Sequence, residues 1–175
     1  IYTDLPNPIQ NSFGDRCQGL HGHVKVSADG TVYVPNMQCG DDGKQGIAVS
    51  SDNGTNWSVK KIPDALYNNF RSDPSIALAK DNTAYFAFED PQGNLKVAVS
   101  HNHGDTWGAS VNVTAPAGIA YGVMPAAVAG DGERAAVAFF GARDATTLDK
   151  TYENTKYAGV WHLYVAHTYD GGLSW

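Results

Sequence analysis

The sequence predicts an all-β protein built from repeated units of antiparallel strands, and three observations support this prediction. An eight-residue pattern occurs three times, at residues 50–57, 100–107 and 168–175. A short run of β-branched, aromatic and small apolar residues precedes each copy, as expected of a strand that enters a turn. The 19 glycines among 175 residues suit many tight turns, and no stretch shows an apolar period long enough for a helix.

The repeated pattern is Ser or Thr, any residue, Asp or Asn, any residue, Gly, any residue, a small polar residue and Trp. The acidic or amide side chain can accept backbone N–H bonds, glycine supplies a positive φ, and tryptophan buries a large ring beside the turn. Each copy is therefore expected to close a hairpin between two strands. The structural residues expected in these turns are Asp52, Gly54, Trp57, Asn102, Gly104, Trp107, Asp170, Gly172 and Trp175.

These copies resemble the Asp-box, or bacterial neuraminidase repeat, of the sialidase superfamily, whose members are β-propellers. The resemblance implies four-stranded antiparallel blades, with each box between the third and fourth strands. Because a propeller needs roughly four to eight blades, we expect an arc of about three blades from a six- to eight-bladed ring, or a partial ring that closes by self-association. The repeats are expected at residues 1–57, 58–107 and 108–175 of this single arc.

The strands are placed by turn residues and apolar runs, taken along the chain. Residues 1–8 are expected to form the outermost strand of a preceding blade, and a loop carrying Cys17 follows. The expected strands of the first unit cover residues 23–27, 31–34 and 45–49, with a polar loop over 36–44. An outer strand is then expected over 58–62, followed by strands over 75–79, 83–88 and 95–99. Those of the third unit cover 126–129, 134–140 and 159–166, with a polar insertion over 141–158. The inner-strand turns are aligned on Asp29, Asp81 and Asp131.

The two cysteines, Cys17 and Cys39, flank the first predicted hairpin. In an antiparallel pair, these positions come within a couple of residues of facing each other, which favours a disulfide and suits a secreted or cell-surface protein. Two free thiols are one alternative. A metal site with His21 and His23 is another, although the spacing is not a standard zinc pattern. We therefore expect a disulfide, no metal and no cofactor.

Net charge and hydropathy narrow the classes of partner. The formal net charge of −6 argues against nucleic acid or an anionic membrane surface. No apolar run approaches the roughly 20 residues of a membrane-spanning helix. A carbohydrate ligand, further blades of the same propeller, or a second copy of the chain are the partners that we expect.

The functional site is expected on the face opposite the boxes, because that face collects the longer and more polar loops. Residues 70–76 resemble the Arg-Ile-Pro segment of sialidases, in which the arginine clamps the carboxylate of the substrate, as a guanidinium does bidentately. An extra residue between Arg71 and Pro74, and a position after a box, depart from the family pattern. The alternative role for Arg71 is a surface pair with Asp73.

The resemblance also implies roles for other residues on this rim. Sialidases use a tyrosine nucleophile assisted by a glutamate, with an aspartate as acid and base, outside the usual two-carboxylate scheme. The candidate catalytic residues are Arg71, Asp73, Glu89 and Arg143, and the candidate substrate-binding residues are His21, Asp90, Asp144 and Tyr157. The family set needs three arginines, and only two fall on this rim.

The expected function is an extracellular exo-glycosidase acting on sialic-acid-type sugars, and the alternative is a non-catalytic propeller for glycan or protein recognition or for a surface assembly.

Overall fold

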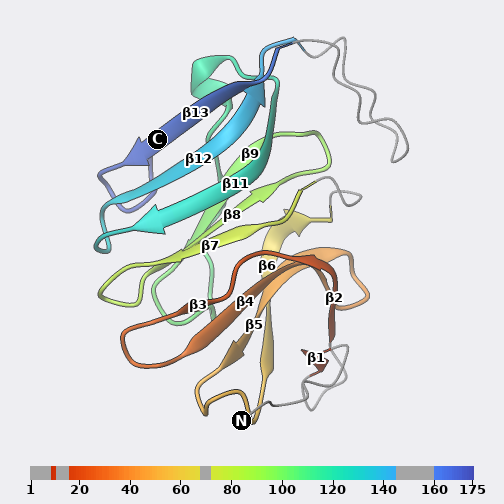
Figure 1. Ribbon diagram of the computed structural model, residues 1–175, viewed down its shortest axis with the longest axis vertical. Helices are drawn as coiled ribbons and strands as arrows, with labels where there is room; N and C mark the ends of the chain where they lie inside the picture. The colour runs from red at the N-terminus through yellow and green to blue at the C-terminus, as the bar shows by residue number, and fades with distance from the viewer. Residues whose placement is uncertain (1–8, 11–15, 68–71, 145–159) are drawn as a thin grey trace.

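The protein is all-β, as predicted, with its strands arranged in three antiparallel sheets. The computed structural model describes residues 9–10, 16–67, 72–144 and 160–175. Within these ranges it contains thirteen strands and one 3₁₀ turn, Ala115–Ala117. The sheets follow one another along the long axis of the molecule, from β1–β6 at one end to β11–β13 at the other (Figure 1).

The first sheet has the strand order β1-β2-β4-β5-β6, and β3 also pairs with β4. Its strands are β1 (Ile9–Gln10), β2 (Arg16–His21), β3 (Lys25–Val26), β4 (Val32–Cys39), β5 (Lys44–Ser50) and β6 (Ser58–Leu66). The strands β2 and β3 therefore form one interrupted inner strand on the same edge of β4. The predicted loops around Cys17 and Asn36 are wrong, because Cys17 pairs with Cys39 and His21 pairs with Asn36 along the β2–β4 ladder.

The second and third sheets agree more closely with the prediction. The second, in the order β10-β9-β8-β7, contains β7 (Ser75–Leu78), β8 (Ala84–Glu89), β9 (Leu95–Ser100) and β10 (Val111–Asn112). The third, in the order β11-β12-β13, contains β11 (Tyr121–Ala129), β12 (Ala135–Ala142) and β13 (His162–Thr168). The predicted first strand of the third sheet is too short, and β12 extends into the predicted insertion, most of which lies outside the described residues.

The hairpins between the first two strands of each sheet close at equivalent backbone pairs. The N–H of Ser27 donates to the carbonyl of Thr31 at 2.9 Å, and that of Ala79 donates to Thr83 at 2.8 Å. In the third sheet the N–H of Gly130 donates to Arg134 at 3.0 Å. Gly130 therefore corresponds to Ala79, and the alignment of the third turn on Asp131 is wrong by one residue.

Two apolar clusters join the sheets face to face. One lies between the first and second sheets and includes Tyr33, Ile47 and Phe86, all fully buried. The other lies between the second and third sheets and includes Tyr85 and Val137. The inner strands β3, β7 and β11 line one shared depression, so the sheets are arranged about a common axis as the blades of a β-propeller are.

The three repeated turns follow β5, β9 and β13 and are closed by the same hydrogen bonds. In the second turn, the Ser100 hydroxyl donates to Asn102 Oδ1 at 3.0 Å and accepts from the N–H of Gly104 at 2.9 Å. Asn102 Oδ1 also accepts from the N–H of Thr106 at 2.9 Å. The first and third turns repeat this geometry around Asp52 and Asp170. The first two of these turns lead into β6 and β10, which lie at the edges of their sheets.

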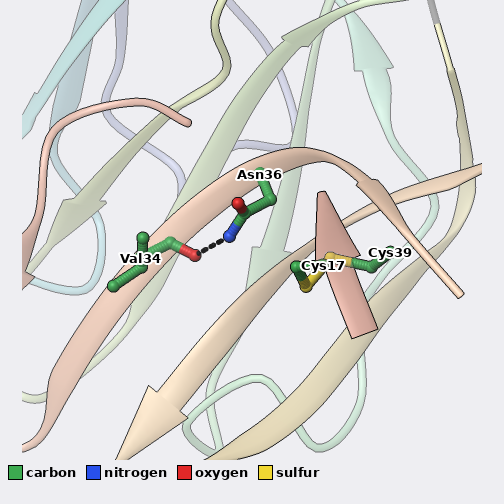
Figure 2. The surroundings of a disulfide bond; sticks show 4 residues. All are labelled: Cys17, Val34, Asn36 and Cys39. Atoms are coloured by element: carbon green, nitrogen blue, oxygen red, sulfur yellow. Dashed lines mark hydrogen bonds between the residues drawn. A yellow bond between two sulfur atoms is a disulfide. The ribbon is translucent and has the colours of Figure 1, made fainter. Parts of the chain in front are cut away.

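The predicted disulfide is confirmed. Cys17 and Cys39 are bonded to each other across β2 and β4 (Figure 2). The zinc alternative is wrong, because both thiols are used in this bond and the described residues contain no other group of three or more His, Cys, Asp or Glu side chains suited to a metal. Asn36, beside the disulfide, donates through Nδ2 to the carbonyl of Val34 at 2.8 Å (Figure 2).

Candidate functional site

A pocket of about 430 Å³ lies where the three inner strands begin, on the face opposite the repeated turns. The break between β2 and β3 contributes His23, the segment before β7 contributes Ser72 and Asp73, and the start of β11 contributes Met124. We call this the rim pocket, and its full lining is Leu20, Gly22, His23, Ser72, Asp73, Pro74, Ser75, Met124, Pro125 and Ala126. The predicted rim therefore contains a cavity.

Two close contacts hold the inner strands together at the pocket. A Cβ at Gly22 would lie 1.8 Å from the carbonyl oxygen of Pro74, so only glycine allows this approach between the first two inner strands. The backbone N–H of Ala127 on β11 donates to the Ser75 hydroxyl of β7 at 3.0 Å. The pocket is thus built on strands fixed to one another, which is a suitable support for a binding site.

Met124 has an unusual backbone at the pocket wall. Its φ is 55°, a conformation that costs a non-glycine residue free energy and persists only where the surroundings impose it. The β11–β12 register shifts between Val123 and Ala126, and this irregularity turns the Met124 side chain outward, where 62% of it is exposed. The strained residue presents a flexible apolar side chain to the pocket.

Glu89 lies behind the pocket wall at the end of β8. Its side chain is 1% exposed, and its Oε2 accepts a hydrogen bond from the Ser72 hydroxyl at 3.0 Å. Gln45 Nε2, from the first sheet, donates to the Glu89 backbone carbonyl at 2.8 Å and to that of Leu66 at 2.7 Å. A buried carboxylate is therefore connected to the pocket through Ser72, which lines it.

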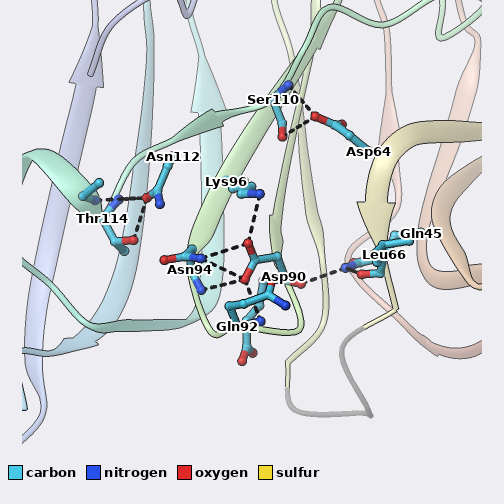
Figure 3. A network of polar contacts seen from close by, with 12 residues as sticks. Gln45, Asp64, Leu66, Asp90, Gln92, Asn94, Lys96, Ser110, Asn112 and Thr114 are labelled. Atoms are coloured by element: carbon cyan, nitrogen blue, oxygen red, sulfur yellow. Dashed lines mark hydrogen bonds and ion pairs between the residues drawn. The ribbon is translucent and has the colours of Figure 1, made fainter. Parts of the chain in front are cut away.

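Asp90 has a different environment, shown in Figure 3. Its carboxylate accepts hydrogen bonds from the backbone of Gln92 and Asn94 at 2.9 Å each, and from Asn94 Nδ2, and it pairs with Lys96 at 3.0 Å. Burial raises the pKa of Asp90, but the hydrogen bonds from Asn94 and Lys96 outweigh it and leave the pKa below its usual value. These contacts close the β8–β9 turn, and Asp90 does not line the rim pocket.

The other predicted site residues are only partly brought together. Asp73 is exposed in the pocket lining, and His21 is exposed beside it, with Nδ1 3.2 Å from the carbonyl of Gly22. Arg143 and Asp144 are exposed beyond the end of β12, where Arg143 Nε donates to Tyr164 Oη at 3.3 Å. Arg71 and Tyr157 lie outside the described residues.

Sequence reasoning missed Ser72 and gave no role to Met124. Ser72 lies within residues 70–76, the segment that resembles the sialidase motif, so its position in the chain was a usable signal. Nothing in the sequence marked the backbone of Met124, because a register shift inside a strand has no residue signature here. The pocket combines an imidazole and a carboxylate with the apolar side chains of Leu20 and Met124. Such a mixture can bind hydroxyl groups and one apolar face of the same ligand.

Comparison with known proteins places the fold among propeller glycosidases. A point mutant of NanB sialidase from Streptococcus pneumoniae superposes with a TM-score of 0.53 at 16% identity, over 89% of this chain and 24% of the sialidase. The GH93 α-L-arabinofuranosidase of Fusarium graminearum, in complex with arabinobiose, gives a TM-score of 0.52 at 19% identity, over 84% of this chain and 44% of the enzyme. At these identities, the likeness shows the fold alone.

The chain spans about a quarter of the length of the sialidase and less than half that of the arabinofuranosidase. No protein-family model matches the sequence, and no curated protein matches it. Within the ranges that the structure describes, no helix is long and apolar enough to cross a membrane.

Proposed function

We propose that this chain is part of a carbohydrate-active propeller whose rim pocket binds a terminal sugar of a glycan. The observation that carries the proposal is the convergence of three inner strands on one pocket with both polar and apolar walls. His23 and Asp73 can bind sugar hydroxyls, and Met124 can contact the apolar face of a ring. Two solved structures of similar fold are a sialidase and an arabinofuranosidase. This likeness supports a sugar as the ligand.

The catalytic form of this proposal is an exo-acting glycoside hydrolase for sialic-acid-type sugars. In it Arg71 clamps the substrate carboxylate, Asp73 is the acid and base, and the buried Glu89 is the supporting carboxylate. The exposure of Asp73 in the pocket suits proton exchange with a leaving group. The repeated turns are assigned to the Asp-box type and to a structural role, within one arc of repeats at residues 1–57, 58–107 and 108–175.

One observation favours the alternative, recognition of a glycan without catalysis. Among the described residues, those that line the rim pocket include no tyrosine and no arginine. Hydrolysis by the sialidase mechanism would need a tyrosine and an arginine from outside the described lining of the rim pocket. Sugar binding needs only the groups already in that lining. The disulfide supports a secreted or cell-surface location for either function.

The test measures release of a fluorophore from an α-sialoside and from an α-L-arabinofuranoside by the full-length protein. Asp73→Asn is expected to reduce turnover by about 100-fold or more, as for loss of a general acid. Glu133→Gln is the matched control, because Glu133 is an exposed carboxylate in the turn between β11 and β12, and it should leave turnover unchanged.

Binding of sialyllactose without turnover, measured by calorimetry and weakened by Asp73→Asn, would establish the recognition alternative. If neither sugar binds nor reacts, or if Asp73→Asn and Glu133→Gln behave alike, the proposed function is wrong.

A further inference from the structure

A second cavity, of about 450 Å³, lies on the face of the molecule that carries the repeated turns. It has no part in the function proposed for the rim pocket. The turn between β3 and β4, the first repeated turn and β6 contribute Asp29, Ser51, Asn56, Trp57 and Lys60. The second repeated turn contributes His103. We call this cavity the turn-face pocket, and its wall joins the first sheet to the second.

His103 occupies a position where the repeat gives no reason for an imidazole. The corresponding residues of the first and third turns are Asn53 and Gly171, and φ is 57° at His103, 60° at Asn53 and 72° at Gly171. A positive φ is uncommon for a residue other than glycine. The ring is held by the first sheet, because its Nδ1 lies 2.7 Å from Tyr33 Oη. When Tyr33 donates to Nδ1, the neutral ring carries its proton on Nε2.

Asp29 lies beside His103 and has one carboxylate oxygen in long contacts only. Its Oδ1 accepts from the Ser27 hydroxyl at 2.6 Å and from the N–H of Thr31 at 3.0 Å. Its Oδ2 is 3.4 Å from Asn82 Nδ2 and 3.8 Å from His103 Nε2. Hydrogen bonds from Ser27 and Thr31 lower the pKa of Asp29 to about 2. Its Oδ2 is therefore a charged acceptor at the pocket wall that a ligand hydroxyl can reach.

Lys60 places an amine on the wall at another position where the repeat does not need one. It pairs with Ile47 of β5, and the corresponding pair in the second sheet is Val111 with Val97. The ammonium group of Lys60 forms an ion pair with Asp105. This contact compensates the positive charge, while an ammonium has further N–H groups to donate.

The remaining charges of the pocket are negative. The carboxylate of Asp52, which also lines the pocket, accepts from the N–H of Asn56 at 2.9 Å and from its Nδ2 at 2.7 Å. These bonds lower the pKa of Asp52. Asp29 and Asp52 are thus both ionised at neutral pH, and the positive charge of Lys60 is already paired. The turn-face pocket therefore disfavours an anionic ligand.

Trp57 adds an apolar surface to these polar groups. Its Nε1 donates to the carbonyl of Gly54 at 3.0 Å, so the polar group of the indole is already used within the turn. The ring can then offer the pocket its apolar atoms. Ser51 and Asn56 are exposed and contribute a hydroxyl and an amide. The wall thus combines hydrogen-bond donors, acceptors and an aromatic ring.

We propose that the turn-face pocket is a second carbohydrate site, which binds a neutral sugar unit of a glycan. Each sugar hydroxyl both donates and accepts a hydrogen bond, as hydroxyl groups do. Asp29 can accept from such a group, and Lys60 and His103 can donate to it. The C–H surface of the sugar ring can pack on Trp57. A sugar that carries a carboxylate is disfavoured by the two ionised aspartates.

A cationic group, such as a lysine side chain of a partner protein, is the alternative ligand that two carboxylates suggest. Lys60 and His103 count against it, because a cation offers them no acceptor and the ammonium group of Lys60 repels it. A neutral sugar uses the donors and the acceptors of the wall together.

The test is calorimetric titration of the full-length protein with lactose, cellobiose and arabinobiose, and with Nα-acetyl-lysine amide as a cationic probe. Ser51→Arg fills the pocket from an exposed position, and the corresponding residues of the other turns, His101 and Tyr169, show that a large side chain is tolerated there. Asp29→Asn keeps an oxygen for Ser27 and Thr31 but replaces the acceptor at the pocket wall. Each substitution should weaken binding of a neutral disaccharide by about 10-fold or more.

Thr55→Arg is the matched control, because Thr55 is exposed in the same turn and does not belong to the lining of the turn-face pocket. It should bind the disaccharide as the wild type does. This pattern, with a neutral disaccharide bound by the wild type and the control, supports the site.

Three results would overturn the proposal. One is the absence of binding by any of the three disaccharides at millimolar concentration. Another is binding that Asp73→Asn weakens and Ser51→Arg does not, which would place the sugar in the rim pocket. The last is binding of Nα-acetyl-lysine amide in place of the sugars, lost in Ser51→Arg. The function proposed for the rim pocket is judged separately, from sialyllactose and Asp73→Asn, so either site can fail without the other.

Discussion

Gly22 shows how one residue determines the geometry of the rim pocket. A Cβ at this position would overlap the carbonyl of Pro74, a backbone atom that cannot rotate away. Gly22→Ala should therefore separate the first two inner strands and lower the free energy of unfolding by about 1–3 kcal/mol, as overpacking does. Urea denaturation followed by tryptophan fluorescence measures the loss. Gly130→Ala is the control, because the atom nearest to its Cβ would be 3.9 Å away; equal effects of the two substitutions would refute the argument.

The hydroxyl group of Ser72 is expected to stabilise the fold through its hydrogen bond to Glu89. Its hydroxyl donates to the buried Glu89 carboxylate, and Ser72 itself is 4% exposed. Ser72→Ala leaves a buried oxygen without this donor, and should cost about 1–3 kcal/mol of stability. Ser110→Ala is matched to it, because Ser110 donates to the exposed Asp64 carboxylate at 2.7 Å, where water can replace the hydroxyl. The control should change stability by less than about 0.5 kcal/mol, and a reversed order in urea denaturation would contradict the prediction.

The stability of the third repeated turn is expected to depend on pH through the carboxylate of Asp170. Hydrogen bonds from the side chain and backbone of Ser174, and from Thr168, lower the pKa of Asp170 to about 2, against an ordinary value of about 3.9. A depressed pKa in the folded state means that the contribution of Asp170 to stability is complete above the ordinary pKa. It is lost as the pH falls toward 2.

Asp170→Asn should keep the turn, because Asn102 makes equivalent hydrogen bonds in the second turn. The variant should lose less stability than the wild type between pH 4 and pH 2.5, since its amide does not titrate. Urea denaturation at pH 7, 4 and 2.5 measures the difference. Parallel losses in both proteins would show that Asp170 is not among the groups responsible.

The disulfide stabilises the most irregular element, the interrupted inner strand of β2 and β3. Bonds that close a loop of this size, with a sequence separation of 22, stabilise by roughly 3 kcal/mol on the chain-entropy account. Replacing both Cys17 and Cys39 with Ala should lower the free energy of unfolding by about that amount. Reduction of the wild type should have the same effect in urea denaturation. Full stability after either treatment would mean that the β2–β4 pairing needs no cross-link.

The strands that the sequence predicted well are those with clear alternation between marked turns. Strands β7, β8 and β9 begin and end within one residue of their predicted limits. Strand β2 and the far half of β4 were missed, because polar residues such as Gln18 and Gln38 occupy paired positions there. The disulfide between Cys17 and Cys39 joins these two segments, and no apolar alternation in the sequence marks their pairing.

The position of the candidate site followed from topology, because loops that precede inner strands lie at one end of a propeller. Its composition did not follow. Ser72 lines the pocket and donates to the buried Glu89, and Met124 lines it at a register shift in β11. Both depend on contacts between segments far apart in the sequence, which residue types alone do not specify.

At the scale of the molecule, polar contacts supplement the apolar clusters between consecutive sheets. Tyr33 Oη lies 2.7 Å from His103 Nδ1 and joins the first sheet to the second repeated turn. Tyr85 Oη donates to the carbonyl of Gly132 and joins the second sheet to the third. Both rings are fully buried, while both hydroxyl groups reach the border of the next sheet. Each pair of consecutive sheets is therefore joined by a polar contact in addition to its apolar cluster.

Removing one of these hydroxyl groups tests whether such contacts stabilise the stack. Tyr85→Phe keeps the ring and its edge-on contact with Trp175 at 6.4 Å, but leaves the carbonyl of Gly132 without its donor. The free energy of unfolding should fall by about 0.5–1.5 kcal/mol, measured by urea denaturation. Tyr169→Phe is the control, because Tyr169 is 73% exposed and its hydroxyl is available to water. If Tyr85→Phe is as stable as this control, then burial of the rings alone holds the second and third sheets together.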